Sequence, residues 1–97
     1  HPLYVNDIDE PDNYLGIPSE RRSKIIDLIT KYEVSVVFTG HLHRNNYKKV
    51  GSTELISTGP VGFPLGNDPS GIRIVQVNDG SLTHEYSPLN SQQRSGR

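Results

Sequence analysis

A short, mostly β-branched run, Val34–Phe38, leads directly into Thr-Gly-His-Leu-His, and this stretch constrains the fold more than any other. An apolar run of this length between polar neighbours predicts a buried strand, in a parallel sheet that is covered on both faces. Gly40 then allows a sharp turn at the carboxyl end of the strand, where open α/β sheets place their ligands. We therefore expect a functional site directly after this strand.

The two histidines that follow the turn, His41 and His43, are separated by one residue. Neutral imidazole is the commonest metal ligand, and two imidazoles projecting from a fixed strand end can donate to a metal. The alternative is that both histidines are surface loop residues without a ligand. Their position after a strand and a glycine favours the metal site.

The composition limits the remaining possibilities. The 97 residues are enough for one small domain, and Leu, Ile, Val and Phe account for only 26 of them, which makes a thin core. There is no cysteine, which excludes disulfides and cysteine-type zinc sites. The net charge of -1 favours neither nucleic acid nor an anionic membrane as a partner. We find no membrane-length apolar run or signal peptide and expect a cytoplasmic location.

A helix is predicted from Ser19, as the N-cap, to Tyr32. One face of this segment is apolar, with the spacing of an amphipathic helix, and is formed by Ile25, Ile26, Leu28, Ile29 and Tyr32. The charged residues, which include Arg22, occupy the opposite face and are expected to be solvated. The helix leads into the Val34–Phe38 strand and is expected to cover the sheet.

The flanking segments are predicted mainly from their turn residues. His1–Val5 resembles the end of a strand that enters an acidic loop, whose spacing does not match a calcium site. After the histidines we expect a polar link over 45–49, a strand over 53–58 and a long loop over 59–71 rich in Gly and Pro.

The last part of the chain is expected to form a hairpin. A strand over 72–77 is followed by the turn Asn78-Asp79-Gly80 and an antiparallel strand over 82–86. His84, on this last strand, is expected to be a surface or interface residue rather than a ligand.

The stretch V-V-F-T-G-H-L-H-R-N resembles the GHxH signature of the calcineurin-like metallophosphoesterases. His1-Pro2-Leu3-Tyr4 resembles the preceding family motif, H-x-P-[LFW]-[YF]. S-T-G-P-V-G-F-P-L-G-N-D-P-S-G-I-R-I-V-Q-V resembles the branch described as calcineurin-like phosphoesterase domain proteins, some of which are described as serine/threonine phosphatases. The resemblance covers residues 1–88 and lies in the C-terminal half of the family's domain.

This resemblance implies an α/β fold. The chain would be the C-terminal half of a four-layer αββα sandwich, here with one helix and about five strands. Residues 1–88 would form this portion of the domain, and 89–97 a flexible polar tail. The chain begins with His rather than Met, so we expect it to be a processed product, an engineered fragment or a proteolytic piece.

The resemblance also implies a site with two divalent ions, Mn, Fe or Zn, that activate a water for attack on a phosphoester. His41 and His43 would bind different ions. Asn45 and Arg44 would lie nearby, Arg44 either binding phosphate or forming a surface ion pair. His1 is a further candidate ligand, although it stands at the variable position of H-x-P. The loop over 59–71 would line the substrate cleft.

The implied parent protein is a phosphatase that acts on a phosphorylated substrate. The family's N-terminal ligand motifs are not in this chain, so we expect it to be inactive alone, to hold one ion or none, and to need the N-terminal half of the domain. The alternative is a non-catalytic β-rich fragment that binds metal or self-associates, for example as a homodimer, because a truncated sheet exposes strand edges. We expect no nucleic-acid or membrane partner.

Overall fold

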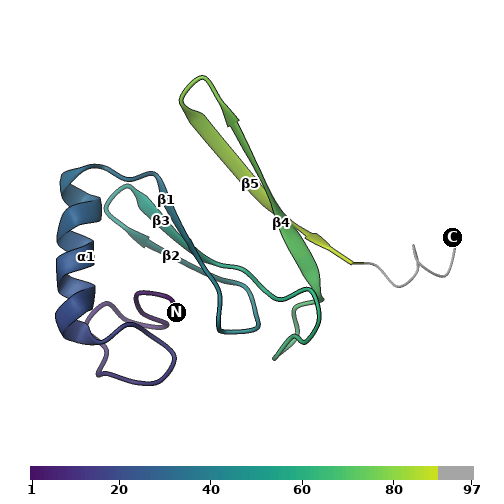
Figure 1. The fold of residues 1–97 in the computed structure, drawn as a ribbon, viewed down its shortest axis with the longest axis horizontal. Coiled ribbons are helices and arrows are strands. Elements are labelled where there is room, and N and C mark those ends of the chain that lie inside the picture. The colour runs from purple at the N-terminus through teal and green to yellow at the C-terminus, as the bar shows by residue number, and fades with distance from the viewer. Residues whose placement is uncertain (90–97) are drawn as a thin grey trace, which may run out of the picture.

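The computed structural model describes residues 1–89, which form one helix and five strands (Figure 1). The elements are α1 (Ser19–Lys31), β1 (Val36–Thr39), β2 (Asn46–Val50), β3 (Thr53–Ser57), β4 (Gly71–Asn78) and β5 (Ser81–Pro88). The predicted α/β class, with one helix and about five strands, is confirmed. Apart from Leu89, the tail predicted over 89–97 lies outside the described residues.

The strands form two small sheets. In the first, with order β1-β3-β2, β1 runs parallel to β3 and β2 runs antiparallel to it. The second is the β4–β5 hairpin, in which Asp79 and Gly80 both have positive φ, as a type I′ hairpin turn requires. In Figure 1, α1 and the hairpin lie on opposite sides of the first sheet. This arrangement is consistent with a fragment of a metallophosphoesterase fold.

The hydrophobic core lies between α1 and one face of the first sheet. Ile29 of α1 packs with Leu55 of β3 and with Leu3 and Tyr4 of the N-terminal segment, and all four side chains are buried. The expectation that both faces of the β1 strand are covered is wrong within residues 1–89. Phe38 is 39% exposed, because only the hairpin approaches that face of the sheet.

The start of α1 differs from its prediction. The N-cap is Pro18, not Ser19, and the main-chain N–H of Ser19 donates to Oδ1 of Asp12 at 2.7 Å. This hydrogen bond lowers the pKa of Asp12 below its ordinary value. Arg22, assigned to the solvated face, is 3% exposed, and its Nη2 donates to the carbonyl oxygen of Glu10 at 2.6 Å. This buried arginine therefore ties the helix to the acidic loop.

Two further segments were predicted wrongly. Residues 1–5 form no strand, and their main-chain groups bond instead to Ile17 and to the carboxylate of Glu10. The link predicted over 45–49 is largely strand β2, in which half-buried and exposed residues alternate. This alternation has the period of two that a half-buried strand shows. The half-buried residues are mostly polar, however, so the sequence has no alternating apolar pattern from which the strand could be predicted. No helix within residues 1–89 is long and apolar enough to cross a membrane.

Candidate metal-binding site

The candidate site begins with a strained turn directly after β1. His41 has φ +71°, and the N–H of Leu42 donates to the carbonyl oxygen of Gly40 at 2.8 Å, which closes a γ-turn around His41. His43 also has a positive φ, +57°. The sharp turn predicted at Gly40 is therefore made by the two histidines. Such conformations cost energy in residues other than glycine, and they concentrate at functional sites.

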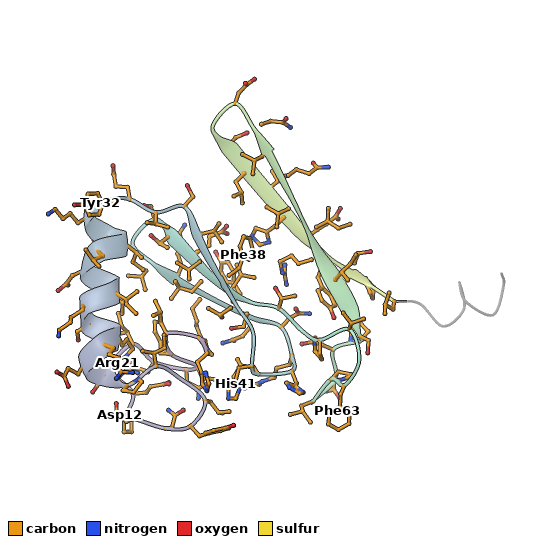
Figure 2. All side chains as sticks on the ribbon, in the orientation of Figure 1. Asp12, Arg21, Tyr32, Phe38, His41 and Phe63 are labelled. Atoms are coloured by element: carbon orange, nitrogen blue, oxygen red, sulfur yellow. The ribbon has the colours of Figure 1, made fainter. Side chains whose placement is uncertain are left out.

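Leu42 anchors this turn. Its side chain is 4% exposed, whereas the histidines on either side are half-buried. Because the residue between them is fixed in the interior, the two imidazoles are held at the edge of the molecule rather than moving with a free loop. Figure 2 shows His41 at this edge, beyond the end of β1.

The imidazole of His41 lies among other rings. It stacks on His1, with ring centroids 3.8 Å apart and planes at 30°, and the edge of Tyr14 approaches it at 5.0 Å. Nε2 of His41 is buried and has no hydrogen-bond partner within residues 1–89. A buried polar atom without a partner is costly, so this nitrogen is suited to bind a group that the described residues do not supply.

The imidazole of His43 is oriented by the 59–71 loop. Its Nδ1 lies 2.9 Å from the carbonyl oxygen of Phe63. A carbonyl only accepts, so Nδ1 carries the proton in this contact, and Nε2 of the neutral ring keeps a lone pair. Histidine ligands of metals are commonly fixed in this way by a second hydrogen bond.

The donor set fits part of a metal site. His41 and His43 each offer an imidazole Nε2, a ligand that suits Zn, Mn or Fe. Residues 1–89 contain no group of three or more His, Cys, Asp or Glu side chains placed to hold a metal ion. The two histidines could therefore hold an ion only together with ligands from outside these residues. His1 lies against His41 by ring stacking, which places it at the site without identifying it as a ligand.

Asn45 and Arg44, the other predicted site residues, differ in their surroundings. Arg44 is exposed, and the structure records no ion pair for it within residues 1–89. Asn45 is half-buried: its N–H donates to Oδ2 of Asp68 at 2.9 Å, and its Oδ1 accepts from the N–H of Gly59 at 2.9 Å. Asn45 is thus fixed to both ends of the 59–71 loop.

Three side chains near Asn45 carry polar contacts that the sequence did not predict. Arg73 of β4 donates from Nη2 to Oδ1 of Asn45 at 3.0 Å and from Nη1 to Nδ1 of His84 at 3.2 Å. Nε2 of His84 lies 3.2 Å from Oε1 of Glu54 on β3. These contacts join the two sheets, and they place His84 at an interface, as expected. The signal available in the sequence was Arg73 itself, a lone charge inside an apolar strand.

Three surface pockets adjoin these residues, and two of them lie beside Asn45 or the ring neighbours of His41. One, of about 550 Å³, is lined by His1 and Tyr14, the ring neighbours of His41, together with residues of the loop before α1 and its first turns. The other, of about 240 Å³, lies between the sheets and is lined in part by Asn45, Arg73 and His84. Asn45 therefore borders a pocket directly, whereas His41 lies near one only through its ring neighbours His1 and Tyr14.

The acidic loop is organised around the carboxylate of Glu10. Burial opposes ionisation of Glu10, but the main-chain N–H groups of Asn6, Val5 and Asp7 and the amide of Asn13 donate to its oxygens. These bonds outweigh burial and lower the pKa of Glu10 from 4.5 to about 2. Glu10 thereby fixes the loop that carries Tyr14 to His41.

Comparisons with known proteins find relatives that are named as phosphatases. The chain is 33% identical over 96 residues to the serine/threonine-protein phosphatase CPPED1 of Homo sapiens, a match that covers 98% of this chain and 31% of that protein. It is 30% identical over 95 residues to the CPPED1 proteins of Rattus norvegicus and Danio rerio, again over 98% of this chain. No family model and no solved structure matches the chain.

These matches cover only part of the relatives. The chain spans about 30% of the length of the curated proteins it matches. Within that stretch the match spans 98% of this chain. The chain is therefore homologous to one stretch of CPPED1, a protein named as a serine/threonine-protein phosphatase.

Proposed function

We propose that this chain is the C-terminal portion of a calcineurin-like metallophosphoesterase domain, and that the longer protein is a phosphatase. The observation that carries the proposal is the buried, unpartnered Nε2 of His41, beside a second imidazole whose Nδ1 proton is held by the carbonyl of Phe63. Both histidines are held in strained backbone conformations by a buried leucine. The similarity to CPPED1 supports the same function.

In this proposal His41 and His43 bind two divalent ions, Mn, Fe or Zn, through Nε2. When bound, the ions would supply Lewis-acid chemistry at the phosphoryl group. Leu42 sets the separation of the two imidazoles, and the Phe63 carbonyl keeps Nε2 of His43 unprotonated. The remaining ligands would come from the N-terminal half of the domain. The proposed substrate is a phosphorylated molecule, and more specifically a protein that carries phosphoserine or phosphothreonine.

The proposal is tested by hydrolysis of p-nitrophenyl phosphate in the presence of MnCl₂. The longer protein is expected to hydrolyse it, and H41A and H43A are expected to lower kcat/KM at least a hundredfold. K49Q, a change at an exposed residue of β2, serves as the control. Hydrolysis by H41A and H43A at the rate of the unmodified protein would contradict the metal assignment.

Self-association is a second candidate function for the isolated chain. Several apolar side chains of β4 are exposed, Val77 by 67% and Ile72 by 48%, and the molecule is only 14 Å thick along its shortest axis. A second copy could cover this surface. Sedimentation velocity tests it: the isolated chain is expected to sediment faster as its concentration rises, and a strictly monomeric chain would contradict self-association.

A further inference from the structure

The amide of Asn45 has only one orientation that satisfies its contacts. The N–H of Gly59 and Nη2 of Arg73 both point to the same amide atom, at 2.9 and 3.0 Å. Both groups are donors, so this atom is the oxygen, Oδ1. The two N–H donors of Nδ2 therefore point away from these contacts, and the structure records no acceptor for them within residues 1–89.

Arg73 is itself held in place by three other groups. Its Nε donates to Oγ1 of Thr58 at 2.9 Å, its Nη1 lies 3.2 Å from Nδ1 of His84, and its guanidinium lies 5.5 Å from the centroid of the Tyr86 ring. Arginine only donates, so Nδ1 of His84 accepts, and its Nε2 donates to Glu54. The donor and the acceptor of each hydrogen bond in the series Glu54–His84–Arg73–Asn45 are therefore fixed.

Asn45 is also tied to the candidate metal ligand two residues before it. The 59–71 loop bonds to His43 through the carbonyl of Phe63 and the N–H of Leu65, and to the N–H of Asn45 through Asp68. Displacement of Asn45 would therefore disturb the same loop that orients His43. The Nδ2 donors and the imidazole of His43 therefore lie on one short segment that the 59–71 loop holds at both residues.

We propose that Asn45 donates from Nδ2 to a phosphoryl oxygen of the bound substrate, and that Arg73 is the positioning residue that fixes its amide for this role. This inference rests on the function proposed above. The negatively charged oxygens of a phosphoryl group accept hydrogen bonds from such donors strongly. The guanidinium of Arg73 donates its hydrogen bonds to Asn45, His84 and Thr58, so Arg73 acts on the substrate only through Asn45.

The substitution Asn45→Asp separates this role from a structural one. A carboxylate still accepts from Gly59 and Arg73, so a purely structural residue would tolerate it, whereas the two N–H donors are lost and a negative charge faces the phosphate. In the longer protein, N45D is expected to keep its Tm, to raise the Ki of inorganic phosphate at least tenfold, and to lower kcat/KM for p-nitrophenyl phosphate by a similar factor.

The role of Arg73 is tested by R73Q, R73K and the double variant. R73Q is expected to raise the Ki of inorganic phosphate, and R73K is expected to raise it less. The double variant N45D with R73Q is expected to lose less phosphate affinity than the sum of the two single losses, because both residues act through the amide of Asn45. K49Q is the control for loss of a positive charge. An unchanged Ki in N45D, or a fall in its Tm that accounts for the lost activity, would overturn the inference. An unmodified protein that neither hydrolyses the ester nor binds phosphate would overturn the proposed function as well.

Discussion

The N–H of Leu65 donates to the carbonyl oxygen of His43 at 2.7 Å, and Nδ1 of His43 donates to the carbonyl of Phe63. Two hydrogen bonds therefore join His43 to the 59–71 loop, one through the backbone carbonyl of His43 and one through its imidazole ring. The loop has no regular structure, yet it fixes a side chain of the candidate site. Phe63, labelled in Figure 2 near the same edge as His41, is itself 68% exposed.

The first prediction concerns the tautomers of two histidines. Neutral His43 is expected to carry its proton on Nδ1, because it donates to Phe63, and neutral His84 on Nε2, because its Nδ1 accepts from Arg73. Nitrogen-15 NMR of the imidazoles at mildly alkaline pH distinguishes the two forms. His84 serves as the internal control, and a proton on Nε2 of neutral His43 would contradict the proposed orientation of its lone pair.

The second prediction concerns the anchor between the histidines. Leu42→Ala is expected to lower the free energy of unfolding by about 2–5 kcal/mol, because it leaves a cavity where a buried side chain was packed. Leu28→Ala, at a residue of α1 that is 55% exposed, is expected to change it by no more than about 0.5 kcal/mol. Urea denaturation of both variants measures the difference. Equal effects would show that Leu42 does not anchor the turn.

The sequence predicted the elements with strong local signals. The apolar spacing of Ile25 and Ile29 located the helix, and Asn78-Asp79-Gly80 located the hairpin turn. It also placed His41 and His43 together after β1. These are features that neighbouring residues determine.

The sequence did not predict features that depend on distant contacts. Arg22 has the spacing of a solvated residue, and only the fold brings the carbonyl of Glu10 to it. The contacts of Arg73 with Asn45 and with His84 join residues that are 28 and 11 positions apart along the chain. Strand β2 has no apolar pattern because it is an edge strand of its sheet, paired with β3, and its half-buried residues are Asn46, Lys48 and Val50.

The third prediction concerns the close approach at the start of β4. A Cβ added at Gly71 would lie 2.6 Å from the carbonyl oxygen of Ser87 and 2.7 Å from Cζ of Tyr86. Gly71→Ala is therefore expected to lower the free energy of unfolding by about 1–3 kcal/mol. Gly62→Ala, in the same loop with no atom within 4 Å of its added Cβ, is the control and should be nearly neutral. Thermal unfolding compares them, and equal Tm values would contradict the packing described at Tyr86.

The last prediction concerns the acid stability that Glu10 provides. Its pKa is about 2 in the folded chain, against an ordinary value of 4.5. A carboxyl group with a lowered pKa stabilises the fold fully above its unfolded pKa, and this contribution is lost as the pH falls toward the folded pKa. The free energy of unfolding should therefore decline between about pH 4.5 and 2.

Glu10→Gln is expected to flatten this decline and to lower stability at neutral pH by about 1–3 kcal/mol, because main-chain N–H groups lose a charged acceptor. Asp9→Asn, at an exposed neighbour, is the control and should keep the decline. Urea denaturation at a series of pH values measures both. A slope in the Gln variant equal to that of the unmodified chain would show that another carboxylate carries the acid sensitivity, and that Glu10 does not hold the loop that brings Tyr14 to His41.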